Sequence, residues 1–581
     1  MLHDLLVLGY PQSELDPLLA TAPLQKRDGV QCYPAATTHI QHFTTPQALV
    51  AYLLNYSNHN LTEITNDSAD TDTLTRDSDR ERERDSSVSI LINEAIFDSN
   101  TGRGHVRKTR SYKAIHTDIN TLPLDKFVQL IHYRFLSLNP IVFTVGEVPK
   151  GRHEKCLQIV EGNISSRLRR IRFWIGLNDE ANTAACTRLN LDPSNLRSLD
   201  SMMNYLTLAA NPPLEDDVRL FFDVLGDNNN FEYASFLRLN YNDEYYIKSL
   251  NSWNFNAFQF SLDDLLHIGF LILKRYYATG ADLNHLQCFL FFVRDNYRLG
   301  NPFHNFRHAI DVLQATNFYL ESLKGDPSAA ELYQISCLDS FSLLLASLGH
   351  DIGHPGITNA FLSSHNTPLA LKFNNTSTLE NYHRIQFENI LIPYLNIARD
   401  NKSLNIDINT QSNWGYLLSV VSDAIMATDM AKHDEFVNEI PILANGPTNF
   451  KLLACLLIKC ADISNVCRPL NISCKWGISL GEEFKQIALL EKYMADPQLH
   501  AALLDDDKSI CPHFVKAVKE IGADEGVQVV PMLPNNQMFF INRFANDFFG
   551  KIVETIPQMQ ILTETMLKNV HFWKHHQHKS S

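Results

Sequence analysis

The stretch HDIGHPG, which runs from His350 to Gly356, places side chains that can bind a metal ion next to one another. His350 offers a nitrogen donor, and Asp351 offers a carboxylate whose two oxygens can contact two cations. His354 follows shortly after them. A single buried histidine is more often a hydrogen-bonded core residue than a ligand, but this combination predicts a metal site.

Two other segments supply residues of the same types. In FHNFRHAIDVLQ, His304 and His308 are four positions apart and therefore share one face of a helix. The segment KCADISN supplies Asp462 after an apolar run. A histidine pair at this spacing arises easily by chance in a chain with 23 histidines. The three segments together predict a metal site that is assembled by tertiary folding.

These segments also carry a family resemblance. Together with two further motifs, and in this order, they resemble the class I 3′,5′-cyclic nucleotide phosphodiesterases, and among these the fungal high-affinity cAMP phosphodiesterases. The resemblance extends from about Asn251 to the region after Phe549. The motifs are HNFRHAIDVLQ (His304 to Gln314), HDIGHPG (His350 to Gly356), LEN (Leu379 to Asn381), TDMAKH (Thr428 to His433) and CADISN (Cys460 to Asn465).

The resemblance implies a role for each metal-binding and acid–base residue. Asp351 would also contact a second, weaker cation, Mg²⁺ or Mn²⁺, and a hydroxide shared by both cations would attack the phosphorus. His304 would protonate the leaving 3′ oxygen as general acid, and Glu380 would orient His304. His354 and Asn359 would hold metal-bound water. The four residues expected to hold the tight cation, taken to be Zn²⁺, are His308, His350, Asp351 and Asp462.

The resemblance also implies a purine pocket. Gln537 and Phe540, three positions apart, offer an amide for the edge of a base and a ring for its face. Leu480 would form the opposite wall, and Asn465 matches the residue that cAMP-selective members use near the adenine. Phe303 departs from the tyrosine that most relatives have before the HN pair, so a contact of that hydroxyl cannot be transferred to this chain.

We therefore expect hydrolysis of cAMP to 5′-AMP, and alternatives remain open. A dual-specificity or cGMP phosphodiesterase would use the same residues, because an amide can turn to satisfy either purine. Another HD-type phosphohydrolase, acting on nucleoside triphosphates or guanosine tetraphosphate, would need a basic cradle that the sequence does not offer. A non-catalytic scaffold would be expected to lack one of the ligands.

Composition narrows the class of protein. The chain has 581 residues, of which 45% are hydrophobic and 20% charged, so a globular protein of two or more domains is expected. A net charge of −15 argues against a nucleic-acid partner. No apolar run approaches the length of a membrane span, so no membrane partner is expected. Partners considered besides cAMP are a second copy of the chain, forming a homodimer, and a regulator bound by the N-terminal domain.

The ten cysteines lack paired spacing, which favours reduced thiols and a cytoplasmic location, with the nucleus as an additional one. The sequence predicts a mainly α protein. An N-terminal α/β domain over residues 1–212 contains a charged, disordered insertion at about 65–87. The all-α catalytic domain of the HD type follows over 213–575, and 576–581 form a tail.

The predicted elements follow from apolar periodicity. The LLVLG start, Val88 to Phe97 and Pro140 to Val148 are predicted strands, and Leu124 to Phe135 is a predicted helix. Apolar positions at helical spacing predict the bundle. They recur over Leu262 to Tyr277, Leu283 to Tyr297, Ala309 to Leu323, Leu332 to Leu348 and Leu452 to Ala461.

Overall fold

The structure is a computed structural model, which describes four short segments near the N-terminus and most of the C-terminal half. These are residues 3–8, 37–43, 89–92 and 141–144, and then 237, 239–297, 301–365, 367–445, 450–495 and 518–577. The chain divides into two compact units, and the described helices all belong to the second. The predicted helix at Leu124 to Phe135, the predicted insertion at 65–87 and the predicted boundary at 212 lie outside the described residues.

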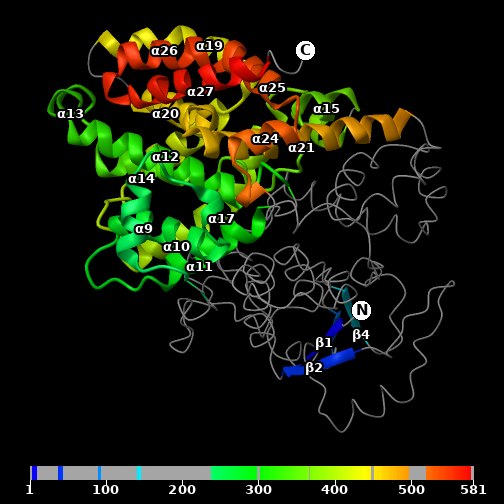
Figure 1. The fold of residues 1–581 in the computed structure, drawn as a ribbon. Helices are drawn as coiled ribbons and strands as arrows, with labels where there is room; N and C mark the ends of the chain where they lie inside the picture. Colours follow the sequence, from blue (N-terminus) through cyan, green and yellow to red (C-terminus); the bar gives the residue numbers. More distant parts are fainter. Residues whose placement is uncertain are drawn as a thin grey trace. The chain divides into compact units, whose positions relative to one another are not determined.

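The four N-terminal segments form one parallel sheet. The strands are β1 (His3–Leu8), β2 (Thr37–Phe43), β3 (Ser89–Ile92) and β4 (Ile141–Thr144). Their order in the sheet is β2-β1-β3-β4, and every pair is parallel (Figure 1). This sheet confirms the three predicted strands, which correspond to β1, β3 and β4. The sequence analysis missed β2, because its sequence TTHIQHF contains no apolar run.

The second unit is helical over its described residues (Figure 1). Its longer helices are α9 (Asp243–Leu250), α10 (Leu262–Leu273), α11 (Asn284–Asn296), α12 (Phe306–Gly325), α13 (Pro327–Tyr333), α14 (Cys337–Gly349), α15 (Asn359–Ser364), α16 (Pro368–Lys372), α17 (Thr378–Asp400), α18 (Gln411–Ala427), α19 (His433–Glu439), α20 (Phe450–Asp462), α21 (Leu470–Ala495), α24 (Ala523–Val529), α25 (Leu533–Phe540), α26 (Asn546–Thr555) and α27 (Ile561–Gln577).

Single turns link several of these helices. They are the 3₁₀ turns η5 (Ala257–Gln259), η6 (Lys274–Tyr276), η7 (Met430–Lys432), η8 (Ile440–Asn445), η9 (Ser464–Cys467) and η13 (Pro557–Met559), and the π turn η12 (Ile541–Ala545).

Two predicted element boundaries are wrong. The apolar stripe from Leu332 to Leu348 is divided between α13 and α14, because Gln334 adopts a left-handed conformation with φ 45° and Ser336 begins a new helix as its N-cap. The predicted tail at 576–581 begins too early, since α27 continues to Gln577.

Helices α12, α14 and α20 form the centre of the helical unit. Each packs against the other two (Figure 1), and α18 packs against both α14 and α20. Their facing sides are fully buried and apolar, as Leu313, Leu345 and Leu456 illustrate. This packing brings together the three segments that carry the predicted metal ligands.

The last turn of α14 leaves no room for a side chain at Gly349. A Cβ built there would lie 2.5 Å from Cδ1 of Phe387 on α17 and closer still to other atoms of that ring. We expect Gly349→Ala to lower the free energy of unfolding by about 1–3 kcal/mol, because overpacking a core forces its neighbours to shift. Urea unfolding of both proteins measures the difference. The control is Gly415→Ala on α18, where a Cβ meets nothing within 4 Å. That change should leave stability unchanged or raise it.

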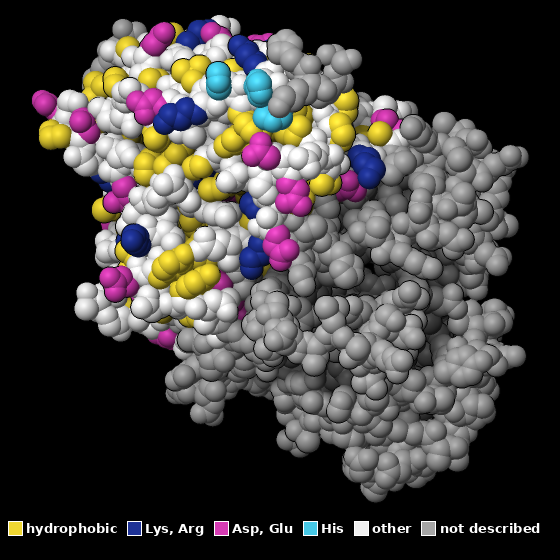
Figure 2. Space-filling model, in the orientation of Figure 1, with side chains coloured by type: hydrophobic (Ala, Val, Ile, Leu, Met, Phe, Trp, Pro, Cys, Tyr) yellow, Lys and Arg dark blue, Asp and Glu magenta, His cyan; other side chains and the backbone are white. Residues whose placement is uncertain are grey.

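The face of the helical unit that Figure 2 shows carries hydrophobic, acidic, basic and histidine side chains. Acidic and basic side chains are interspersed over the face shown in Figure 2. Among the described helices, none is long and apolar enough to cross a membrane alone, and only α13 and α14 together, bent by 90°, meet that length and composition. The described cysteines are free thiols, as predicted: Cys288, Cys337, Cys455, Cys460, Cys467 and Cys474.

Candidate active site

The N-terminus of α12 is fixed by Asn305, and this places His308 in the first helical turn. Asn305 Oδ1 accepts hydrogen bonds from the backbone N–H of Arg307 at 2.9 Å and of His308 at 3.3 Å. These N–H groups have no partner within the helix, so the asparagine acts as its N-cap. His308 therefore projects from a rigid helix end.

The segment HDIGHPG begins where α14 ends. Gly349 is the last helical residue, His350 is the C-cap and Asp351 lies in the following turn. The chain then turns sharply through Gly353 and Gly356, whose φ values of 74° and 78° are strained for residues with a side chain. The two glycines thus allow the turn that keeps His350 and Asp351 at the end of the helix.

Asn301 joins the two histidine-bearing segments. Its side-chain amide donates to the carbonyl oxygen of His304 at 2.8 Å and to that of His354 at 2.7 Å. Both bonds are made by one buried amide group. The backbone before α12 is therefore held against the backbone after α14.

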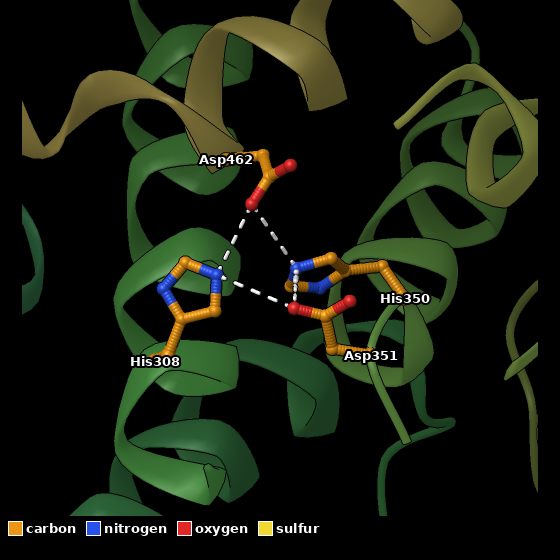
Figure 3. A group of neighbouring side chains, drawn as sticks. All are labelled: His308, His350, Asp351 and Asp462. Atoms are coloured by element: carbon orange, nitrogen blue, oxygen red, sulfur yellow. Dashed lines mark hydrogen bonds and ion pairs between the residues drawn. The ribbon is translucent and has the colours of Figure 1, made fainter. Parts of the chain in front are cut away.

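The four predicted ligands converge from three helices (Figure 3). Nε2 of His308 lies 3.1 Å from Oδ1 of Asp462 and 3.6 Å from Oδ2 of Asp351. Nε2 of His350 lies 3.4 Å from Oδ1 of Asp462 and 3.2 Å from Oδ2 of Asp351. Two imidazole nitrogens and two carboxylate oxygens thus face one common point, as the sequence predicted.

The chemistry of this cluster fits a divalent cation. The carbonyl of Ser347 accepts a hydrogen bond from Nδ1 of His350 at 2.9 Å, so Nε2 is the nitrogen with a free lone pair. Nε2 is completely buried and makes no hydrogen bond, although two carboxylates lie close to it. A buried nitrogen without a partner is unfavourable unless an ion fills the position.

The pKa shifts of His350 and Asp351 also indicate that the cluster favours a bound cation. Burial opposes a charge on His350, yet the negative charges of Asp351 and Asp462 hold the pKa of His350 well above its ordinary value. Burial likewise opposes ionisation of Asp351, but the neighbouring histidines hold its pKa well below its ordinary value. The cluster therefore favours positive charge among its ligand atoms. The C-terminal ends of α14 and α20 add to this preference, because a helix C-terminus carries partial negative charge.

His304 lies beside the cluster and is held by Glu483 on α21. Nδ1 of His304 donates to Oε1 of Glu483 at 2.5 Å, while Oε2 accepts from the backbone N–H groups of Phe303 and His304 at 3.0 and 3.2 Å. Burial lowers the pKa of His304, but the charge and hydrogen bond of Glu483 outweigh it and raise the pKa to about 8. The side chain remains 23% exposed, so its Nε2 can reach a bound ligand.

The rings of His354 and His383 form a stacked row with the ring of His304. The ring of His354 stacks on that of His304 at 3.9 Å, and the ring of His383 on α17 follows at 5.3 Å. The backbone N–H of Gly356 donates to Nδ1 of His354 at 2.9 Å, so Nε2 carries the proton of the neutral ring. Burial lowers the pKa of His354 well below its ordinary value. His354 is therefore a neutral ring whose Nε2–H can donate a hydrogen bond.

The expected partnership between Glu380 and His304 is wrong. Glu380 accepts hydrogen bonds from the side-chain amide of Asn359 at 3.2 and 2.9 Å, and the carboxylate on His304 is that of Glu483. Burial and the nearby charge of Asp429 raise the pKa of Glu380 to about 7. Glu380 and Asn359 thus form a polar pair separate from the pair of His304 and Glu483.

The residues of the predicted purine pocket lie on two packed helices and one turn. Gln537 and Phe540 belong to α25, which packs against α21, the helix of Leu480. A Cβ at Gly477 on α21 would lie 3.0 Å from Cδ of Gln537, so the glycine leaves space for the amide. The amide oxygens of Gln537 and Asn465 are both buried without a hydrogen-bond partner.

The sequence analysis missed several residues of the site. Glu483 lies 179 positions from His304 and has no motif around it. His383 is three positions after Glu380, so its place on the same helix face could have been recognised. Lys459, three positions before Asp462, is buried and donates to the carbonyls of Ala427 and Asp429, both at 3.2 Å.

Comparison with known proteins finds similarity to cyclic nucleotide phosphodiesterases. The sequence profile described as 3′5′-cyclic nucleotide phosphodiesterase matches residues 303–566. The 3′,5′-cyclic-nucleotide phosphodiesterase 2 of Saccharomyces cerevisiae is 31% identical over 373 residues, which are 60% of this chain and 65% of the yeast protein. The cGMP-specific 3′,5′-cGMP phosphodiesterase 3 of Dictyostelium discoideum is 27% identical over 59% of this chain and 67% of its own length.

The match does not cover the whole of the relatives. This chain aligns with 65% of the yeast protein and with 38% of the 3′,5′-cyclic-nucleotide phosphodiesterase regA of Dictyostelium discoideum, which is 28% identical over 56% of this chain.

The crystal structure of yeast caPDE2 in complex with IBMX shares the fold, with a TM-score of 0.65, 23% identity and coverage of 99% of both chains.

Proposed function

We propose that this protein is a 3′5′-cyclic nucleotide phosphodiesterase, as the profile match over residues 303–566 suggests, and that it hydrolyses cAMP to 5′-AMP with two divalent cations. The observation that carries the proposal is the convergence of two imidazole nitrogens and two carboxylate oxygens on one point. Phosphodiester hydrolysis needs neutralised phosphate charge, an activated water and a proton for the leaving oxygen.

The tight cation is proposed to be Zn²⁺, held by His308, His350, Asp351 and Asp462. Tetrahedral zinc with ligands at about 2.0–2.2 Å places neighbouring ligand atoms roughly 3.4 Å apart. The measured separations between these atoms are 3.1, 3.2, 3.4 and 3.6 Å. A second cation, Mg²⁺ or Mn²⁺, would share Asp351, whose other oxygen lies on the side of His383. When bound, the cations would neutralise the phosphate and lower the pKa of water.

The chain's own groups supply the remaining steps. His304, charged and held by Glu483, donates its Nε2 proton to the 3′ oxygen as the bond from that oxygen to phosphorus breaks. Nε2–H of His354 donates a hydrogen bond into the site, and the pair of Asn359 and Glu380 orders water beside Asp351. Water supplies the oxygen that phosphorus gains.

Base recognition is proposed to lie with Asn465 and Gln537, with Leu480 and Phe540 as the walls on either side of the purine. A buried amide oxygen without a partner is unfavourable in the free protein and becomes satisfied when a base binds. The adenine edge presents both a donor and an acceptor, which one amide can match. cGMP is the second candidate, since a turned amide also fits guanine and one relative is named cGMP-specific.

A comparison of substrates tests the proposal. Purified full-length protein is expected to convert cAMP to 5′-AMP with a kcat/KM about tenfold or more above that for cGMP, which corresponds to about 1.4 kcal/mol. Activity should disappear on chelation and return with Zn²⁺ and Mg²⁺. Turnover of dGTP without turnover of cyclic nucleotides would support another HD-type phosphohydrolase instead. A homodimer, a regulator of the N-terminal domain and a cytoplasmic or nuclear location stay predictions.

Removal of the Gln537 amide should weaken substrate binding without affecting the metal centre. We expect Gln537→Ala to raise KM for cAMP about tenfold, because the base loses hydrogen bonds worth about 1.5 kcal/mol. Steady-state kinetics and metal analysis measure the two effects. Gln560→Ala, an exposed glutamine on the same unit, is the control. An unchanged KM would remove Gln537 from the pocket.

The charge of Glu483 should set the alkaline limit of activity. His304 must be protonated to act as acid, so kcat/KM falls as pH rises through its pKa, which Glu483 raises to about 8. Glu483→Gln removes the charge and lowers this pKa. The alkaline limb of the kcat/KM profile should therefore move towards pH 6.5, the ordinary value, or below. Glu482→Gln, the adjacent residue, should leave the limb in place. An unmoved limb in Glu483→Gln contradicts the assignment.

A further inference from the structure

The turn that carries Asn465 is held from outside by side chains far away in the sequence. Turn η9 (Ser464–Cys467) follows Asp462 after one residue, Ile463, and three consecutive carbonyls at its end accept hydrogen bonds from distant side chains. The amide of Asn569 on α27 donates to Val466 O at 2.9 Å and to Arg468 O at 2.8 Å. The indole N–H of Trp253 donates to Cys467 O at 2.9 Å.

Arg468 closes the turn on its other side. Its guanidinium donates to Gln314 Oε1 at 2.8 Å and pairs with Asp311 at 3.2 Å, both on α12. It also lies over the ring of Trp253, 4.3 Å from the ring centroid. The turn is thus joined to α12 through Arg468 and to α27 through Asn569, and both residues are fully buried or nearly so.

Within this turn, the side-chain amide oxygen of Asn465 is not held by a hydrogen bond, unlike the backbone carbonyls that follow it. Its Oδ1 is buried and has no hydrogen-bond partner, so no bond of that atom orients the side chain. The position of this amide therefore depends on the backbone of η9. The bonds to Val466 and Arg468 constrain the backbone directly after Asn465, and Asn569 supplies both of them through one nitrogen.

We infer that Asn569 is a positioning residue for substrate selectivity, which acts by holding the η9 turn so that the Asn465 amide faces the purine base. The inference rests on the proposed function, because it takes Asn465 to be a base-recognition group. Asn569 lies beyond the residues that the family profile matches, which end at residue 566. It acts on recognition and leaves the chemical step unchanged, since its bonds reach the turn after Asp462 and none of the metal ligands.

Kinetics of Asn569→Ala test the inference. KM for cAMP should rise about three- to tenfold, kcat should change less than twofold, and the preference for cAMP over cGMP in kcat/KM should fall. Asn569→Asp, which keeps the shape but cannot donate to two carbonyls, should have at least the same effect. Asn317→Ala is the matched control, because Asn317 is equally buried and bonds Arg275 on the surface of the same unit.

A double-mutant cycle separates positioning from general damage. If Asn569 acts through Asn465, the change Asn569→Ala should add nothing to KM or selectivity in the Asn465→Ala background. Additive effects would overturn the inference. Hydrogen exchange of the peptide that covers residues 463–469 gives a readout independent of activity. Exchange should rise in Asn569→Ala and stay unchanged in Asn317→Ala, and equal exchange in Asn569→Ala and wild type would also overturn it.

The outcomes distinguish the two proposals. If wild-type protein hydrolyses neither cyclic nucleotide, the proposed function fails, and the role of Asn569 in recognition fails with it. If Asn465→Ala alters selectivity and Asn569→Ala does not, only the present inference is overturned. A selectivity change in both single variants, without a further change in the double variant, supports both.

Discussion

Asp462→Ala is expected to lose the tight cation and nearly all activity. Asp462 supplies the oxygen that faces both His308 and His350, at 3.1 and 3.4 Å. Without it, two histidines and one carboxylate remain, and the site loses a negative charge that favours the cation. We expect metal content per chain to fall at least about tenfold and kcat/KM about 10³-fold or more, which is roughly 4 kcal/mol of transition-state stabilisation.

Metal analysis by mass spectrometry and cAMP turnover measure these losses. Asp423→Ala is the control, because Asp423 is a surface carboxylate that pairs with Lys451 at 2.9 Å. It should keep both metal and activity, since an exposed ion pair contributes little. A normal zinc content in Asp462→Ala would refute the ligand assignment, whereas loss of activity with metal retained would assign Asp462 to another role.

His304→Ala is expected to lower kcat about 10²- to 10⁴-fold while metal content stays normal. The reason is that the 3′ oxygen of a ribose is a poor leaving group unless it receives a proton. Glu483 holds His304 in its protonated form and fixes its ring through the 2.5 Å bond to Nδ1. Rates for cAMP and metal content of the purified variant measure the effect.

A change of leaving group tests the acid role directly. A p-nitrophenyl phosphodiester has a leaving group that needs no proton, so His304→Ala should slow its hydrolysis far less than that of cAMP. His571→Ala, at an exposed position of α27, should leave both rates unchanged. Equal losses for the two substrates would show that His304 contributes to binding or structure and not to proton transfer.

Much of the fold could be predicted because the buried face of a helix appears in the sequence as apolar residues at helical spacing. Apolar residues at helical spacing predicted α10, α11, α12 and α20 nearly to their ends. The prediction of one continuous helix over Leu332 to Leu348 was wrong, because apolar periodicity does not reveal a break in a helix. The left-handed Gln334 and the N-cap Ser336 end one helix and begin the next, while the apolar pattern continues across them. Strand β2 was not predicted because its sequence TTHIQHF contains no apolar run.

What the sequence alone determined was which four residues converge in the His/Asp cluster, because each sits in a local context that constrains it. His308 follows the capping Asn305, and His350 and Asp351 lie at the end of an apolar helix before glycines that turn the chain. Only the tertiary structure assigned the partner of His304. Glu380 lies in the LEN motif and Glu483 in no motif, so the local sequence favoured the wrong glutamate. The packing of α21 brings Glu483 to His304, whereas Glu380 bonds Asn359. A hydrogen bond extends only about 3 Å, so its partner depends on the packing of helices from distant parts of the chain.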